Sequence, residues 1–432
     1  MSVDPFTVAL LVISFLALLG LPIGHSMISG SILYLFLSGQ DMGIVAERLL
    51  NSLFTGYVVL AVPLFIFAAE LMNMGSLTQR LLKFCNALVG RFPGGLAQVN
   101  IVQSIIFSGM SGSAIADAAG TGRIIANMMI QDGRYTRSFA AAITAAAAVI
   151  GPIIPPSIPI VLYALVSNAS IGFLFLGGIL PGLLMGLALM VVVVIMSRRR
   201  QFPVEAPVPL RAFPGVTARA FPALMMPVVL LGGIYSGVMT PTEAAAVAAA
   251  YAFVISTLLY RSISARQLYS TLLSGARSSA SIGMLIAGAL VFNYVVTVEN
   301  IPDTLRVFLS GFDMTPMQFL LMVNVVLLLL GTVLEGTAIL LIIVPVFIPS
   351  AQALGIDMVH FGIIAVVNIM IGLVTPPYGL LIFVMQSITR APLRQIVRDL
   401  LPFIGAHFVA LGLITYFPGI VLWLPRLFGY QG

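Results

Sequence analysis

Long uninterrupted apolar segments constrain the fold of this chain more than any other feature. Ile171–Met196 contains no charged residue, and Phe319–Leu330 and Leu340–Phe347 are almost as apolar. A helix crosses the hydrocarbon core of a bilayer with about 20 apolar residues. Backbone groups cannot stay unpaired in lipid, so only helices or closed barrels cross it, and continuous rather than alternating apolar runs exclude a barrel. We therefore expect an all-α polytopic membrane protein.

Composition supports this expectation and narrows the possible chemistry. Only 8% of the 432 residues are charged, against about 25% in ordinary soluble domains. Cys85 is the only cysteine, so an intramolecular disulfide and Cys-based zinc or iron–sulfur sites are excluded, and we expect Cys85 to be buried. The start of the chain has no basic segment and no clear cleavage site, which predicts that the first apolar segment stays as an anchor.

The basic residues are dispersed among short polar segments, although the formal net charge is +6. Examples are Arg198–Arg200, Arg390, Arg394 and Arg398. This distribution is typical of cytoplasmic loops of membrane proteins, where basic side chains face anionic lipid. We therefore expect a lipid bilayer as the surroundings and no nucleic-acid partner.

One motif occurs twice and divides the chain into two halves. Gly151-Pro-Ile-Ile-Pro-Pro returns as Gly372-Leu-Val-Thr-Pro-Pro, with the glycine and both prolines displaced by the same 221 positions, from 151 to 372. A segment rich in glycine and hydroxyl residues precedes each copy, at Ser108–Ser113 and at Gly331–Thr337. The order of parts is thus the same in both halves.

We predict two inverted repeats, because an odd number of crossings in each half inserts the copies with opposite orientation; a parallel repeat is the alternative. The first repeat covers 1–197, with a re-entrant hairpin at about 98–122 and a broken helix at about 140–166. A cytoplasmic, Pro-rich linker covers 198–214. The second repeat covers 215–432, with a hairpin at about 320–348 and a broken helix at about 361–388. Counting interrupted helices, we expect ten to twelve spanning segments.

The repeated segments are the candidate ion site. Proline interrupts a helix and frees backbone groups, and free backbone at membrane depth is tolerated where it lines a site; a plain proline kink is the alternative. Hydroxyl and carbonyl oxygens suit a hard cation, whereas small residues can also serve helix packing. The predicted sodium-binding residues are Ser108, Gly109, Ser111, Gly112, Ser113, Gly151, Pro155, Gly331, Thr332, Gly336, Thr337, Gly372, Thr375 and Pro376.

Charged residues within the apolar regions are candidates for substrate binding, because charge is costly in a membrane. Arg123 could hold a carboxylate with two parallel hydrogen bonds, or it could pair with Asp117 or reach the lipid headgroups. Glu335 could neutralise sodium or cap a helix of the hairpin. The predicted substrate-binding residues are Arg123, Asp117, Pro156, Ser157, Glu335 and Pro377.

Motifs for nucleotide or hydrolytic chemistry are missing from the sequence. It has no Walker-type P-loop, no GxSxG and no HExxH, so we expect no enzymatic activity, no catalytic residues and no cofactor. Any transport would therefore have to be driven by a gradient or by a partner, and sodium is the only metal ion expected.

Four motifs together resemble one known family. They are Phe107-Ser-Gly-Met-Ser-Gly-Ser, Ile150-Gly-Pro-Ile-Ile-Pro-Pro-Ser, Gly237-Val-Met-Thr-Pro-Thr-Glu and Gly372-Leu-Val-Thr-Pro-Pro-Tyr-Gly. In this order they resemble the large membrane subunit, DctM type, of tripartite ATP-independent periplasmic (TRAP) transporters, which belong to the ion-transporter superfamily.

The resemblance implies an elevator-type carrier, in which a transport domain holding both hairpins and both broken helices slides against a scaffold. It also implies the bacterial inner membrane, sodium as the coupling ion and an organic acid as substrate. Two partners are expected: a small four-helix membrane subunit, as a separate polypeptide, and a periplasmic substrate-binding protein. A stand-alone sodium/dicarboxylate-type symporter is the alternative, and a channel is a more distant one.

Overall fold

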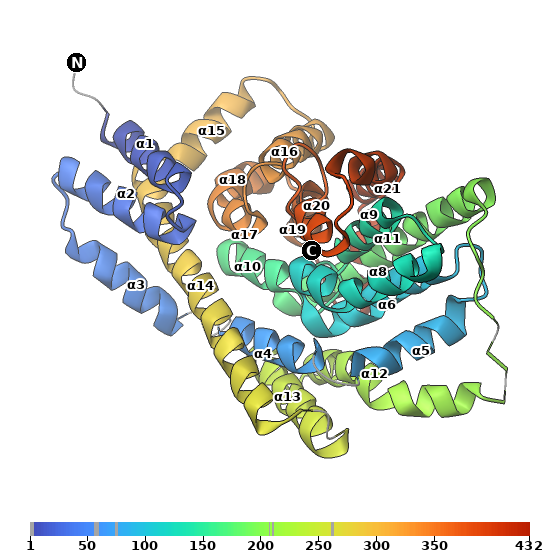
Figure 1. Cartoon of the computed structure of the whole chain (residues 1–432). Helices are drawn as coiled ribbons and strands as arrows, with labels where there is room; N and C mark the ends of the chain where they lie inside the picture. The colour runs from blue at the N-terminus through green and yellow to red at the C-terminus, as the bar shows by residue number, and fades with distance from the viewer. Residues whose placement is uncertain (1–3, 56–59, 74–76, 207, 210, 261–262) are drawn as a thin grey trace.

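All regular structure in the described part of the chain is helical (Figure 1). The computed structural model describes residues 4–55, 60–73, 77–206, 208–209, 211–260 and 263–432. The elements of the first half are α1 (Pro5–Leu18), α2 (Ile23–Leu37), α3 (Gly43–Thr55), α4 (Ala61–Asn73), α5 (Leu77–Val89), α6 (Leu96–Ser111), α7 (Ala114–Asp117), η2 (Ala118–Gly122), α8 (Arg123–Ile130), η3 (Gln131–Gly133), α9 (Arg137–Ala148), α10 (Ile158–Ser167) and α11 (Ile171–Arg200). Those of the second half are α12 (Phe213–Tyr235), α13 (Pro241–Val254), η4 (Ile255–Leu259), α14 (Ala265–Val298), α15 (Ile301–Ser310), α16 (Pro316–Gly331), α17 (Gly336–Ala338), η5 (Ile339–Ile343), α18 (Val344–Ala353), α19 (Met358–Gly372), α20 (Leu380–Thr389), α21 (Leu393–Tyr416) and α22 (Gly419–Leu427).

Several helices are long and apolar enough to cross a membrane, which confirms the expected all-α polytopic class. Among the described residues there are six such helices, or up to seven if α4 and α5 together form one more. The six are α11, α12, α13 with η4, α14, the segment from α17 to α18, and α21. The count of ten to twelve expected from the sequence also included shorter apolar segments. In the structure the apolar helices α1, α2, α10, α16, α19 and α20 have 10–17 residues and are too short for this criterion.

The long helix α11 shows how the apolar residues divide between the two surroundings. Leu183, Leu187, Val191 and Ile195 follow one another at four-residue intervals and are all exposed, whereas Leu189 is fully buried. Residues four apart share one face of a helix. An exposed face made of large aliphatic side chains is stable in lipid and unfavourable in water, so this face of α11 suits an apolar membrane environment.

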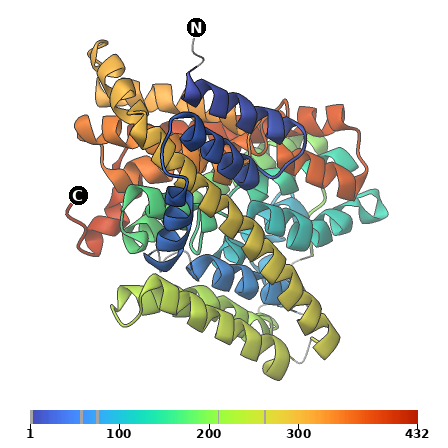
Figure 2. The same cartoon turned by 90° about the vertical axis from the view of Figure 1, so that its left-hand side faces the viewer.

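The helices form two groups that pack against each other (Figures 1 and 2). In the first group, called the frame, the 34-residue helix α14 packs against α2, α3 and α4, and α13 packs against α4 and α12. In the second group, called the inner bundle, α11 packs against α6, α21 and α22, α9 against α20 and α21, and α16 against α19. The helices α5 and α15 connect the groups, because α5 contacts α12 and α6 and α15 contacts α14 and α18.

The inner bundle contains the two hairpins and the two interrupted helices. The first hairpin enters through α6, turns at Gly112 and Ser113, and returns through α7, η2 and α8; the second enters through α16 and returns through α17, η5 and α18. Each return arm contains a π-helical turn, η2 or η5. The interrupted helices are α9 with α10 and α19 with α20, and each interruption holds a cis Pro–Pro peptide. Each of these elements extends a few residues beyond the bounds expected from the sequence.

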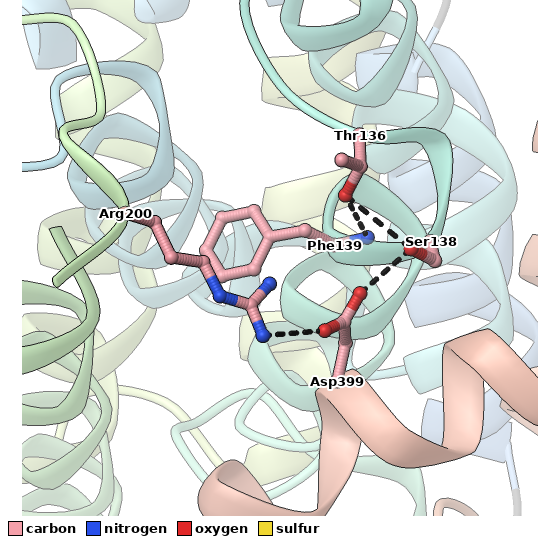
Figure 3. A network of polar contacts seen from close by, with 5 residues as sticks. All are labelled: Thr136, Ser138, Phe139, Arg200 and Asp399. Atoms are coloured by element: carbon pink, nitrogen blue, oxygen red, sulfur yellow. Dashed lines mark hydrogen bonds and ion pairs between the residues drawn. The ribbon is translucent and has the colours of Figure 1, made fainter.

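The start of the linker differs from the expected residue 198. Helix α11 continues through Arg200, so Arg198–Arg200 form its last turn, where positive charge is favourable at the carboxyl end of a helix. The Arg200 guanidinium lies 2.7 Å from one carboxylate oxygen of Asp399, and the Ser138 hydroxyl donates to the other at 2.6 Å (Figure 3). These contacts join α9, α11 and α21, which lie far apart in the sequence.

Candidate substrate and ion site

One cavity lies where both hairpin tips meet both helix interruptions. Its volume is about 240 Å³. The first hairpin contributes Gly112, Ser113, Ala114 and Ile115, and the second hairpin contributes Glu335, Gly336 and Thr337. The first interrupted helix contributes Pro152, Ile158 and Pro159, and the second interrupted helix contributes Met370, Leu373 and Leu380. Helix α14 of the frame contributes Ile282. Segments that the sequence singled out in separate halves therefore enclose one space between the frame and the inner bundle.

The first hairpin tip packs directly on the first interruption. Gly112 has a left-handed backbone (φ 61°), and a Cβ atom added there would lie 2.6 Å from the Pro156 carbonyl oxygen. A Cβ atom on Gly151 would lie 3.7 Å from the Ser113 carbonyl oxygen. On the other side of the hairpin, a Cβ atom on Gly109 would lie 2.5 Å from Pro227 of the frame and 3.8 Å from the Pro155 carbonyl oxygen. The glycines permit this backbone-to-backbone approach.

Hydroxyl groups concentrate at this contact. The Ser111 hydroxyl lies 3.3 Å from both the amide nitrogen and the carbonyl oxygen of Ser113. The Ser113 hydroxyl accepts from the Ala116 amide at 3.4 Å, while Ser108, deeper in α6, donates to the carbonyl of its own helix. Ser157 caps α10, since its hydroxyl accepts from the Ile160 amide at 3.2 Å and donates to the Pro152 carbonyl. The first predicted site is thus rich in neutral oxygen atoms.

The second hairpin meets the second interruption in a similar way. A Cβ atom on Gly372 would lie 2.8 Å from the Gly331 Cα atom, and one on Gly336 would lie 2.8 Å from the Ile369 side chain. Thr332 and Thr375 each donate at 2.8 Å to a carbonyl of their own helix. Pro376 lies in the same interruption, half-buried.

Glu335 is the only titratable side chain among the described residues that line the cavity. Its carboxylate accepts from the Ala338 amide at 3.2 Å and from the Thr337 hydroxyl, so it caps α17. From the sequence, Glu335 was expected either to neutralise sodium or to cap a helix of the hairpin. These hydrogen bonds correspond to the capping role. The first turn of α10, with Ile158 and Pro159, also faces the cavity, and the amino end of a helix carries partial positive charge that favours anions.

Of the six predicted substrate residues, Glu335 alone lines this cavity; Pro156 and Ser157 lie in the first interruption without being among the lining residues. Arg123 begins α8 and is exposed, and Pro377 is exposed at the second interruption. Asp117 is 1% exposed and accepts a hydrogen bond from the Thr121 hydroxyl at 2.7 Å. Within the described ranges no ion pair joins Asp117 to Arg123. Conversely, the apolar walls of the cavity, such as Ile282, could not be recognised in the sequence, because an apolar side chain facing a cavity looks the same in sequence as one facing lipid.

The fold and the cavity define a class of protein: a multi-pass membrane transport protein with two hairpins and two interrupted helices around one central space. A solved structure with a similar fold is that of the YdaH transporter of Alcanivorax borkumensis, described as having an unusual topology. The TM-score is 0.67 at 16% sequence identity, over 89% of this chain and 90% of that one. At this identity the likeness concerns the fold alone.

The family is shown by sequence comparison. Residues 10–420 match the family model of the tripartite ATP-independent periplasmic transporter, DctM component. The chain is 39% identical to the sialic acid TRAP transporter large permease protein SiaM of Vibrio cholerae, over 95% of this chain and 96% of that one. It is also 39% identical to the C4-dicarboxylate TRAP transporter large permease protein DctM of Pseudomonas aeruginosa, over 93% and 94% of the two chains. The protein belongs to the DctM family, the large permease component of TRAP transporters, as its four motifs predicted.

A further relative contains more than the segment it shares with this chain. The isethionate TRAP transporter permease protein DctMQ of Oleidesulfovibrio alaskensis is 38% identical over 97% of this chain, which covers 66% of that relative. These three relatives carry the names of transporter permeases and not of enzymes.

Proposed function

We propose that this protein is the large transmembrane subunit of a sodium-driven TRAP transporter that imports an organic acid across the bacterial inner membrane. The observation that carries the proposal is the cavity shared by both hairpin tips and both interruptions. Alternating access needs a site that two structural units enclose near the middle of the membrane. Residues of the inner bundle and Ile282 of the frame line this cavity together, which supports the proposal.

Sodium would bind at the two contacts between a tip and an interruption. The first offers the Ser111 and Ser113 hydroxyls beside the carbonyls of Ser113 and Pro156. The second lies at the Gly331–Gly372 contact. The second hairpin carries Thr332 and Thr337 there, and the second interruption carries Thr375. Hard cations prefer such oxygen ligands.

The carboxylate of the substrate would bind within the cavity between these two places. The amino end of α10 favours an anion there, and two bound sodium ions would compensate the charge of Glu335. Arg123 is exposed and lies outside the cavity lining, so we propose no contact between Arg123 and the substrate in this conformation. Relatives named for sialic acid, C4-dicarboxylates and isethionate all concern acids, which supports an organic acid as the substrate class.

We further propose the inverted-repeat, elevator-type arrangement, with the inner bundle moving against the frame, and two partners: a small four-helix membrane subunit and a periplasmic binding protein. The DctMQ relative, longer than this chain, supports a second membrane component. The binding protein would deliver the acid, so the large subunit without it should give background flux only.

Reconstitution into liposomes tests the proposal. The protein, with its small subunit and binding protein, should take up labelled sialic acid or a C4-dicarboxylate when sodium is high outside, without ATP. Uptake that persists when potassium replaces sodium, with no proton gradient imposed, would exclude sodium coupling. Strong uptake without the binding protein would favour the stand-alone symporter.

A further inference from the structure

A cluster of basic side chains lies on α5 and α12, away from the cavity at the hairpin tips. Arg80, Lys83 and Arg219 line a second cavity of about 260 Å³ together with Gln79 and Val216. No acidic residue is among these lining residues, and within the described ranges no carboxylate makes an ion pair with Lys83 or Arg219. Lys83 and Arg219 carry like charges that repel each other around this space unless an anion joins them.

The cluster is held in place by the surrounding helices. The Arg80 guanidinium stacks over the Tyr260 ring at 4.2 Å, and the Tyr260 hydroxyl donates to the Arg219 carbonyl at 2.9 Å. Lys83 stands exposed on α5, one turn after Gln79, on the opposite side of the helix from the fully buried Cys85. The cations are therefore brought together by the fold.

The position of α5 points to the membrane surface. Leu77, Leu81 and Phe84 are buried beneath the helix, while Gln79 and Lys83 are exposed above it. A helix with one apolar and one basic face suits the interface between lipid headgroups and acyl chains. The carboxyl end of α5 also lies beside the linker that follows Arg198–Arg200, because the Glu205 amide donates to the Gly90 carbonyl at 3.0 Å.

A third cavity adjoins this cluster and offers apolar surface. Gln79 and Lys83 line both cavities, and the walls of the larger one, of about 360 Å³, include Leu82, Val99 and Ile124. Arg134 and Glu205 also line it, and they pair with each other at 2.5 Å. A soluble phosphate ion needs only the cations, whereas a phospholipid needs cations beside an apolar surface. The combination favours a lipid.

The helix in the corresponding place of the second half lacks this excess of charge. Like α5 before α6, α15 precedes the hairpin helix α16, and Arg306 of α15 lines a cavity there. Arg306 pairs with Asp303 at 3.2 Å, and Asp313 lines the same cavity. The excess of cations is therefore found at α5 and not at α15.

We propose that the cavity between α5 and α12 binds the phosphate of an anionic glycerophospholipid through Arg80, Lys83 and Arg219. Basic pockets between membrane helices on the cytoplasmic side bind such headgroups. Because α5 contacts both α12 of the frame and α6 of the first hairpin, the bound lipid stabilises the junction between the two groups of helices.

The test uses the purified protein in neutral detergent, with dioctanoyl-phosphatidylglycerol, dioctanoyl-phosphatidylcholine and inorganic phosphate as probes in thermal-shift titrations. Phosphatidylglycerol should raise the melting temperature, phosphatidylcholine should not, and phosphate should do so weakly. Lys83→Gln and Arg219→Gln should each weaken the effect about fivefold, Lys83→Arg should retain it, and the matched variant Arg306→Gln should behave as the wild type.

Three results would overturn the proposal. Equal shifts with the two lipids would show that charge plays no part, and a full shift with phosphate alone would indicate a site for a soluble anion. An equal loss in Arg306→Gln would mean that the effect is general surface charge. Melting temperatures without lipid, together with size-exclusion profiles, separate a folding defect from lost binding. If Lys83→Gln does not fold, the test at this position is whether Lys83→Arg retains the shift with phosphatidylglycerol.

Discussion

The backbones of Gly331 and Gly372 touch where the second hairpin meets the second interrupted helix: a Cβ atom on Gly372 would lie 2.8 Å from the Gly331 Cα atom. The first half solves the same problem with Gly112 against the Pro156 carbonyl oxygen, at 2.6 Å. In both halves a hairpin approaches the interruption so closely that a side chain does not fit. At each interruption, where the helix lacks some of its regular hydrogen bonds, the backbone of a hairpin therefore lies in direct contact with the interrupted helix.

The first prediction follows from this contact. Gly372→Ala should lower the free energy of unfolding by about 1–3 kcal/mol, because an added methyl group must displace backbone, and it should reduce uptake strongly. Gly405→Ala on α21, where nothing lies within 4 Å of an added Cβ atom, should change neither. Thermal unfolding beside uptake measures both effects, and equal behaviour of the two variants would contradict the assigned contact.

The second prediction concerns sodium. Ser111→Ala and Thr337→Ala should raise the sodium concentration needed for half-maximal uptake about fivefold, since a lost neutral oxygen partner costs about 1 kcal/mol. Thr257→Ala is the matched control, because the Thr257 hydroxyl is exposed and bonds only to its own helix at the Phe253 carbonyl. Sodium titrations at constant protein level test this. If all three variants keep the wild-type sodium requirement, the hairpin hydroxyls do not bind sodium.

The third prediction separates Arg123 from the cavity. Arg123→Ala should leave half-saturation for the substrate unchanged within about twofold, because Arg123 is exposed and is not among the residues lining the cavity. Ile158→Trp places a larger side chain in the cavity, and it should abolish uptake while the protein stays folded. A large loss of substrate affinity in Arg123→Ala would restore the role that its charge suggested from the sequence.

The parts of the fold that local chemistry determines could be predicted. Proline removes a backbone donor wherever it stands, so Pro155 and Pro376 indicated the two interruptions without any knowledge of neighbours. Similarly, glycine beside hydroxyl residues indicated both hairpin tips, and uncharged apolar length indicated α11.

The parts that depend on distant neighbours could not be predicted. Ile282 reaches the cavity from α14, yet nothing in the sequence separates it from lipid-facing isoleucines. Arg200 and Asp399 pair across 199 positions without a local signal. The charge of Arg123 suggested function because charge is costly in lipid, but the fold places Arg123 outside the lining of the cavity, and nothing in the local sequence indicates this.

The fourth prediction concerns the pair that joins α11 to α21. Arg200→Gln should destabilise the protein by about 1–3 kcal/mol, because it leaves the largely buried Asp399 carboxylate, with 10% of its side chain exposed, without its cation. Arg306→Gln should cost about 0–1 kcal/mol, since both partners of that pair are exposed. The double variant Arg200→Gln with Asp399→Asn should lose less than the sum of its single changes. Thermal unfolding of the four variants is the measurement, and strictly additive losses would show that the two side chains do not interact.

The last prediction tests the orientation of the molecule through the two ends of α11. This helix has 30 residues and a length of about 45 Å, enough to place its ends on opposite sides of a bilayer. In a background with the buried Cys85 replaced by serine, Val204→Cys in the linker should react with a membrane-impermeant thiol reagent only from the cytoplasmic side. Ser170→Cys, just before α11, should react only from the periplasmic side. Both positions are exposed, so a failure to react cannot be due to burial.

Labelling of Val204→Cys from the periplasm would reverse the topology and would also place the basic cluster on α5 and α12 on the wrong side for the anionic lipids of the cytoplasmic leaflet. Labelling of both positions from the same side would mean that α11 does not cross the membrane.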